Sequence, residues 1–244
     1  MLRLLRFVVR IALIPLIVAL GYEAFVAMRS TLSGQIITWF VAGLGAYLLF
    51  YVALFGDQGK TIQFLETFKH ELSHAAILLL VLKLPETFAI DVSDDNKSDT
   101  GGGVRPSTGC FLGLLAPYYL PVFTIPLLLI KPVTPSSLHK VMDFIIGFSL
   151  AIHYITAIKD FHYKQTDITR TGKVFSLVMT ILLNIVWLVI ILCVVTDNYG
   201  GIVTYFKSSV SRAVEIYKAT PQRWQTTAAP ALASAWEGVQ QVWE

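Results

Sequence analysis

His70, Glu71 and His74 spell the pattern H-E-x-x-H at the start of a predicted helix. On a helix, residues four positions apart lie on the same face, so both imidazole rings can reach one metal ion. Zinc binds neutral imidazole nitrogens and keeps one coordination position open at catalytic sites. A zinc ion would acidify a water there, and Glu71 is close enough to accept its proton. The pattern therefore predicts a zinc site with His70 and His74 as ligands and Glu71 as the general base.

The surroundings of the motif favour a functional interpretation. Residues 75–82 form an unbroken apolar octet directly after it, so the three ionisable side chains lie near or below a membrane surface. Ionisable groups at that depth are costly, and by default they indicate a functional site. The alternative is structural: two interfacial histidines that hydrogen-bond to neighbouring helices.

The composition indicates a membrane protein. The chain has 244 residues, of which 55% are hydrophobic and only 14% charged, and its mean hydropathy is +0.65. Ordinary soluble domains carry roughly 25% charged residues, and disordered chains have low hydrophobicity. The net charge of +3 is small and scattered, which argues against nucleic acid as a partner. The expected environment is the lipid bilayer.

Six segments are apolar enough to predict spanning helices, because a span needs about 20 such residues. They are residues 8–28, 35–55, 64–83, 109–130, 138–158 and 174–195. Arg3, Arg6 and Arg10 precede the first segment, which favours an uncleaved span with a cytoplasmic N-terminus. Several lysines near the ends of these segments, Lys69 and Lys131 among them, are expected to extend to water.

Two polar regions have a different character. Residues 84–108 contain four aspartates and the run Gly101-Gly102-Gly103, which predicts a small β-hairpin and a glycine-rich loop. A solvated connector is the alternative for this region. Residues 197–244 form a C-terminal tail with apolar residues at helical spacing, which predicts an amphipathic helix in the membrane interface. A helix packed against protein is the alternative for the tail.

The predicted fold class is an all-α polytopic membrane protein with about six transmembrane helices, the small hairpin and the amphipathic tail. Three units are expected along the chain. An N-terminal transmembrane pair occupies residues 1–63, a membrane core with the H-E-x-x-H motif occupies residues 64–196, and the interfacial tail occupies residues 197–244. The sequence gives no indication of the oligomeric state.

The motif and its context resemble the site-2-protease group of intramembrane zinc peptidases (peptidase family M50, in its M50B-like bacterial branch). The resemblance covers roughly residues 64–184 and rests first on H-E-x-x-H. Softer support comes from the glycine run, from a glycine- and proline-containing segment at residues 109–121, and from residues 165–172, Q-T-D-I-T-R-T-G.

The resemblance implies an activity and a location. The activity is zinc-dependent hydrolysis of peptide bonds within or beside transmembrane segments, with membrane proteins as substrates. The implied location is the bacterial cytoplasmic membrane, which the chain would cross several times. His70 and His74 carry over as zinc ligands, and Glu71 carries over as the general base.

The third zinc ligand is open among three aspartates. Asp167 ranks first, because its polar context resembles the motif that M50B-like chains carry ahead of a late span. Asp143 is the rival, early in the fifth apolar segment, where a buried carboxylate is rare. Asp160 is the third candidate, although a partnership with Lys159 or Lys164 is its simpler role.

Topology bears on this choice. If every segment crosses the membrane fully, Asp167 faces the side opposite the motif, and Asp143 faces the same side. Pro117, Pro121 and Pro126 in the fourth segment each remove a backbone donor and can break the helix. A broken fourth segment would remove the objection to Asp167.

Asn184, Gly102 and Gly103 are the predicted substrate-binding residues. A transmembrane substrate must unwind before hydrolysis, and its freed backbone groups then need partners. The hairpin edge beside the glycines can pair with an extended strand. Asn184 can hold that strand or a developing oxyanion, with helix-to-helix hydrogen bonding as the alternative.

Two other functions compete with the peptidase. The first is a catalytically silent membrane scaffold or regulator of the same fold, against which the intact motif argues. The second is a transporter or metal-ion carrier, which needs polar residues along a continuous path through several spans. The polar residues of this chain instead concentrate at one motif, so the carrier ranks last.

Overall fold

The computed structural model describes residues 15–27, 29, 37–55, 60–80, 111–162 and 165–219, and within these ranges its regular secondary structure is all helical. The helices are Pro15–Ala27, α2 (Thr38–Phe55), α3 (Lys60–Leu80), α4 (Phe111–Tyr119), α5 (Thr124–Ile130), η2 (Lys131–Val133), η3 (Ser136–Leu138), α6 (His139–Asp160), α7 (Thr166–Thr171), α8 (Lys173–Val195) and α9 (Tyr199–Ala219). The predicted hairpin at residues 84–108, including Gly102 and Gly103, lies outside the described residues. The three N-terminal arginines also lie outside them.

The described part of the chain contains membrane-length helices. Ser136–Asp160 and Lys173–Val195 are each long and apolar enough to cross a membrane, and α4 with α5 makes a third if the two form one broken span. Pro15–Ala27 and α2 are apolar but shorter or interrupted, and α3 carries several charged residues in its first half. The all-helical, membrane-type fold is therefore confirmed at this level, whereas six full crossings remain a prediction.

The fourth apolar segment is broken, as its prolines predict. Helices α4 and α5 meet at an angle of 81°. The last regular bond before the break runs from the Leu120 amide to the Ala116 carbonyl at 2.8 Å. The next residue, Pro121, has no N–H and cannot bond the Pro117 carbonyl. The break therefore leaves carbonyl oxygens at the end of α4 that need other donors.

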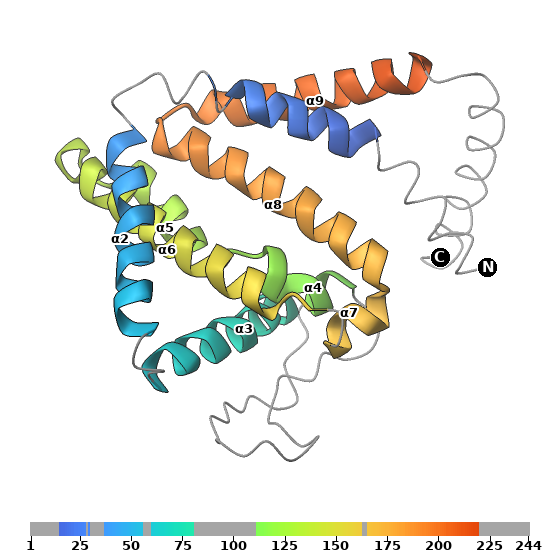
Figure 1. Ribbon diagram of the computed structural model, residues 1–244. Helices are drawn as coiled ribbons and strands as arrows, with labels where there is room; N and C mark the ends of the chain where they lie inside the picture. The colour runs from blue at the N-terminus through green and yellow to red at the C-terminus, as the bar shows by residue number, and fades with distance from the viewer. Residues whose placement is uncertain are drawn as a thin grey trace.

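Helix α4 is the centre of the lower half of the molecule. It contacts α3, α6, α7 and α8, and these elements converge around it (Figure 1). Its residues Leu115, Ala116 and Tyr118 have no exposed surface. The short helix α4 therefore sets the spacing between the helix with the H-E-x-x-H motif and the late helices.

Helices α2 and α6 pack extensively against each other, and their backbones approach closely (Figure 1). A Cβ atom placed on Gly43 would lie 2.0 Å from the Phe144 carbonyl oxygen, and one on Gly147 would lie 2.0 Å from the Phe40 carbonyl oxygen. Two glycines on facing helices thus allow the backbones to touch. This contact holds α6 in place from the side opposite α8.

Helix α9 lies beside Pro15–Ala27 (Figure 1). The Tyr205 hydroxyl donates to the Leu20 carbonyl at 3.2 Å, and Arg212 Nε donates to Glu23 Oε1 at 2.5 Å. A helix in the predicted tail is thereby confirmed over Tyr199–Ala219, and it packs on the N-terminal helix. Its placement in a membrane interface remains a prediction.

The glycine contact can be tested by Gly43→Ala. The added methyl group collides with backbone atoms of α6, so the helices must separate, at a cost of about 1–3 kcal/mol in unfolding free energy. Gly45→Ala is the matched control, because a Cβ at Gly45 meets nothing within 4 Å. Thermal unfolding in detergent, followed by circular dichroism, should show a lower midpoint for Gly43→Ala only. Equal midpoints would contradict the close approach.

Candidate metal centre

The structure brings His70, His74 and Asp167 together, although 93 residues separate His74 from Asp167. His70 Nε2 lies 3.8 Å from Asp167 Oδ2, and His74 Nε2 lies 3.6 Å from the same oxygen. One ligand atom from each residue lies within 4.8 Å of the other two. The cluster combines one face of α3 with the first turn of α7.

Both imidazole rings are oriented by acceptors on their other nitrogen. His74 Nδ1 is 2.8 Å from the Gly113 carbonyl oxygen, and His70 Nδ1 is 3.2 Å from Asp160 Oδ2. A carbonyl oxygen can only accept, so His74 carries its proton on Nδ1, and a carboxylate imposes the same tautomer on His70. In its neutral form, the form that binds a metal ion, each ring therefore presents an unprotonated Nε2 toward Asp167. This is how proteins orient histidines that bind metals.

The geometry fits zinc. Ligand atoms about 2.0–2.1 Å from a tetrahedral zinc ion are about 3.3–3.4 Å apart. The two Nε2-to-Oδ2 distances, 3.6 and 3.8 Å, exceed this value by only a few tenths of an ångström. Two imidazoles and one carboxylate also leave a fourth position open, as catalytic zinc sites do. The three side chains thus have the chemistry and the spacing to hold the ion, and their role as ligands remains a prediction.

The Asp167 carboxyl group is in the ionised state that binding a metal ion requires. Burial alone raises its pKa, but without a metal ion the protonated Nε2 atoms of His70 and His74 face it, and these contacts outweigh burial and hold the pKa well below its ordinary value. A carboxylate must be deprotonated to bind a metal ion. Asp167 is therefore ionised at neutral pH before any metal arrives.

The local sequence around Asp167 fixes helix α7. Ile168, the next residue, is fully buried, and the Thr171 hydroxyl donates to the Asp167 carbonyl at 2.7 Å. Gly172 ends the helix with a φ of 96°, a backbone conformation that glycine adopts without strain. The turn at Gly172 joins α7 directly to α8, so Asp167 lies at the start of the late apolar helix.

Glu71 lies on α3 between the two histidines and is partly buried. Its carboxylate is close enough to His70 to interact with it electrostatically. This position is compatible with the predicted general base, and that role remains a prediction.

Asp143, the rival ligand, lies at the other end of helix α6. It pairs with Lys131, whose Nζ is 2.7 Å from Asp143 Oδ1. Asp160, which contacts His70, is 17 residues further along the same helix, a rise of about 25 Å. The structure therefore does not bring Asp143 to the motif.

Asp160 contacts a histidine of the motif, whereas the simpler role predicted for it was a partnership with a neighbouring lysine. Its carboxylate contacts His70, whereas the neighbouring Lys159 donates to Glu66 Oε1 at 2.5 Å. Asp160 therefore orients a predicted ligand and does not join the three clustered ligand atoms. The objection that full crossings separate Asp167 from the motif also falls, because α3 and α7 lie at the same end of the molecule (Figure 1).

Asn184 makes hydrogen bonds between helices. Its Nδ2 donates to the Tyr118 carbonyl at 2.9 Å and to the Thr180 carbonyl at 2.8 Å. Its Oδ1 accepts from His153 Nε2 at 3.0 Å. The structure thus shows the helix-to-helix alternative for Asn184, and binding of substrate remains a prediction. The other two candidates, Gly102 and Gly103, lie outside the described residues.

Two lysines expected to extend to water are instead buried. Lys69 is 1% exposed and donates to the Pro117 carbonyl, the oxygen that Pro121 cannot serve. Lys131 is fully buried and donates to the Val194 and Val195 carbonyls at 2.9 and 2.8 Å. The expectation was wrong because it treated lysine as a membrane-interface residue. The spacing of Pro117 and Pro121 was the signal that a donor was needed.

Comparison with known proteins identifies no family for this chain. Scans against protein-family models, curated proteins and solved structures each returned no match to this chain. The candidate site therefore rests on the residues and geometry of this chain.

Replacing Asp167 and Asp143 in turn distinguishes a predicted metal ligand from a residue of a structural ion pair. Asp167→Ala should weaken zinc affinity by more than about 100-fold, beyond the loss of an outer partner. Asp143→Ala should keep zinc but lower the free energy of unfolding, because buried Lys131 loses its closer carboxylate and keeps only the half-exposed Asp197 at 3.3 Å. The loss should therefore be smaller than the about 3–5 kcal/mol expected for a buried charge left without any partner. Competition with a zinc chelator and thermal unfolding measure the two effects. Zinc loss on Asp143→Ala instead would assign the third ligand to Asp143.

Asp160→Asn tests the orientation of His70. An amide is a weaker acceptor than a carboxylate and can rotate its NH₂ toward Nδ1, so zinc affinity should fall about 10–100-fold. Asp197→Asn is the control, because Asp197 is an exposed carboxylate paired with His139 and Lys131 at the other end of the molecule. Unchanged zinc affinity in Asp160→Asn would remove the positioning role.

Proposed function

We propose that this protein is an intramembrane zinc endopeptidase that hydrolyses peptide bonds in or next to transmembrane segments of membrane proteins. The observation that carries the proposal is the convergence of two oriented Nε2 atoms and one ionised carboxylate. The resemblance to site-2 proteases, which rests on sequence, independently leads to the same activity. The proposal includes a multi-pass arrangement of about six spans in the bacterial cytoplasmic membrane.

In this proposal, each residue of the centre has one task. His70, His74 and Asp167 hold the zinc ion, which when bound polarises the scissile carbonyl and acidifies a water. Glu71 accepts a proton as the water oxygen adds to the carbonyl carbon. It then delivers that proton to the leaving nitrogen as the carbon–nitrogen bond breaks.

The location of the centre supports a membrane substrate. His70 contacts Asp160 at the end of α6, and Asp167 lies on α7, which leads directly into α8. Both α6 and α8 have apolar stretches long enough to cross a bilayer. His74 is 4% exposed, and His70 and Asp167 are partly buried, so the predicted ligands are shielded from bulk water. Hydrolysis at such depth requires an unwound substrate segment and a site with few competing waters.

Glu71→Gln tests the proposed activity. The glutamine side chain keeps the shape of the glutamate but cannot accept the proton, so cleavage should fall by about 10²–10⁴-fold with zinc content and thermal stability unchanged. The assay uses purified full-length protein in detergent or vesicles with a transmembrane peptide substrate, together with elemental analysis of bound metal. Retained cleavage by Glu71→Gln would overturn the peptidase proposal. A folded chain that binds no zinc would favour the scaffold.

A further inference from the structure

The Tyr118 hydroxyl is a buried polar group that the roles assigned so far do not use. The side chain lies near the end of α4 and has no exposed surface. Among the residues that the structure describes, the hydroxyl finds no hydrogen-bond partner. Buried hydroxyls in proteins are normally paired, so an uncommitted one beside a reactive centre is available to bond a ligand.

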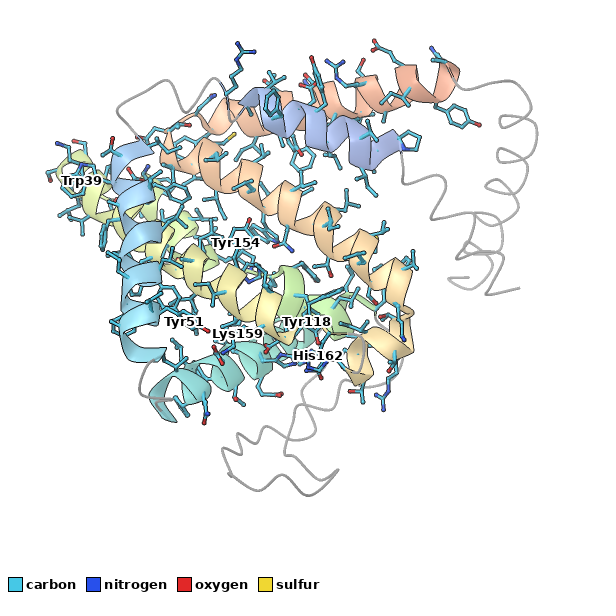
Figure 2. The ribbon with its side chains drawn as sticks, viewed as in Figure 1. Trp39, Tyr51, Tyr118, Tyr154, Lys159 and His162 are labelled. Atoms are coloured by element: carbon cyan, nitrogen blue, oxygen red, sulfur yellow. The ribbon has the colours of Figure 1, made fainter. Side chains whose placement is uncertain are left out.

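Tyr118 lies beside the candidate metal centre. Its ring meets the His70 ring edge to face, with centroids 5.9 Å apart at 88°, and meets the Phe161 ring at 5.4 Å and 86°. The carboxylates of Asp167 and Asp160 are close enough to interact with the hydroxyl electrostatically. Figure 2 shows Tyr118 where α3, α4, α6 and α7 converge. The Tyr118 side chain therefore packs directly against the predicted ligand His70.

The backbone at Tyr118 is held firmly. Asn184 donates to its carbonyl at 2.9 Å, and Lys69 donates to the preceding carbonyl of Pro117. The two rings that flank the side chain restrict its rotation. A donor held in this way needs no reorganisation when charge develops nearby, which is the condition for electrostatic catalysis.

A cavity of about 300 Å³ reaches Tyr118 from between α6 and α8. Apolar side chains, including Ile158 and Leu177, line much of it, and Asn184 lies in its wall. Ile158 is 75% exposed, so the rim of the cavity faces outward from the helix bundle. An apolar polypeptide segment that enters between these helices would contact Tyr118.

Three other donor side chains near the centre, those of Asn184, Lys69 and His153, are already engaged. The Asn184 amide bonds Tyr118 and Thr180 carbonyls, and Lys69 bonds the Pro117 carbonyl. His153 donates its Nε2 proton to Asn184. The hydroxyls of Tyr118 and Thr180, which both line the cavity, have no hydrogen-bond partner among the described residues, and of the two Tyr118 packs against the predicted ligand His70.

We propose that Tyr118 is a catalytic residue whose hydroxyl donates a hydrogen bond to the scissile carbonyl oxygen as negative charge develops on it. This inference rests on the proposed peptidase function. As the water oxygen bonds to the carbonyl carbon, the π electron pair moves onto the carbonyl oxygen, and the O–H of Tyr118 stabilises it without giving up its proton. When the carbon–nitrogen bond breaks, the carbonyl re-forms and the hydrogen bond weakens. The interaction is thus strongest in the transition state.

Tyr118→Phe removes one oxygen atom and tests the proposal. The kcat for a transmembrane peptide should fall about 10²–10³-fold with little change in KM, as for loss of one oxyanion donor. Zinc content and thermal stability should match the wild type, because the hydroxyl makes no bond within the described protein. Tyr119→Phe is the matched control, since its hydroxyl donates to the Leu112 carbonyl at 3.2 Å.

A second readout does not depend on turnover. A phosphinic peptide mimics the charged tetrahedral state, so its affinity for zinc-loaded Tyr118→Phe should weaken at least about tenfold relative to wild type. Placing 4-aminophenylalanine at position 118 restores a donor on the same ring and should recover part of kcat and affinity. Placing 4-methylphenylalanine there fills the space without donating and should recover neither.

The outcomes separate this inference from the function on which it rests. If Tyr118→Phe keeps kcat and phosphinic-peptide affinity within about twofold of wild type while Glu71→Gln is inactive, the role of Tyr118 is overturned and the peptidase stands. Equal recovery by the amino and methyl analogues also overturns the role, because filling space would then suffice. If the wild type neither binds zinc nor cleaves, both proposals fall.

Discussion

The candidate centre depends on how the carbonyl groups freed at the break between α4 and α5 are satisfied. In a medium without water, each unpaired backbone group costs several kcal/mol. Lys69 donates a hydrogen bond to the Pro117 carbonyl, and Asn184 donates one to the Tyr118 carbonyl. Lys69 comes from α3 and Asn184 from α8, so satisfying the break joins three helices. The same break that leaves these carbonyls without helical donors therefore fixes the positions of the elements around the centre.

The pairing of α3 with α4 also orients a predicted ligand. Lys69 reaches Pro117, and His74 reaches the carbonyl of Gly113, four residues earlier on α4. The two contacts run in opposite directions along the two helices, which makes α3 and α4 antiparallel neighbours. One helix-to-helix contact thus satisfies a broken backbone at one point and sets the tautomer of His74 at another.

Helix α6 separates two clusters of charge. Asp143, near the start of α6, pairs with Lys131, which is buried beside the last carbonyls of α8. The negative end of the α8 dipole also stabilises a cation there. Asp160 at its end contacts His70. The first pair holds the ends of two long helices together, and the second holds a ring that faces the centre. The sequence left both aspartates open as zinc ligands, and the roles that they have in the structure follow from which end of α6 each occupies.

The sequence predicted the local features and missed the long-range pairings. The apolar segments, the H-E-x-x-H face of α3 and the break at the prolines follow from periodicity and from the missing N–H of proline. The grouping of Asp167 with the motif came from resemblance, because its contact with His74 spans 93 residues and no local pattern encodes it. The buried positions of Lys69 and Lys131 were missed for a related reason. Each lysine donates to a carbonyl that a proline or a helix end leaves without a backbone donor, and no local pattern shows which distant residue packs beside that carbonyl.

The formal charges of the cluster give a physical reason for a divalent ion at this depth. Asp167, Asp160 and Glu71 contribute −3, and Lys69 contributes +1, so with neutral histidines the sum is −2. Uncompensated charge in a low-dielectric region is costly. An ion of charge +2 brings this sum to zero while leaving both imidazoles neutral, as metal ligation requires. Without the ion, the same balance needs protons on the histidines, and a protonated Nε2 cannot bind a metal. Protons and a divalent cation therefore compete for the same two nitrogens, and the arrangement of carboxylates around them determines how strongly either is held.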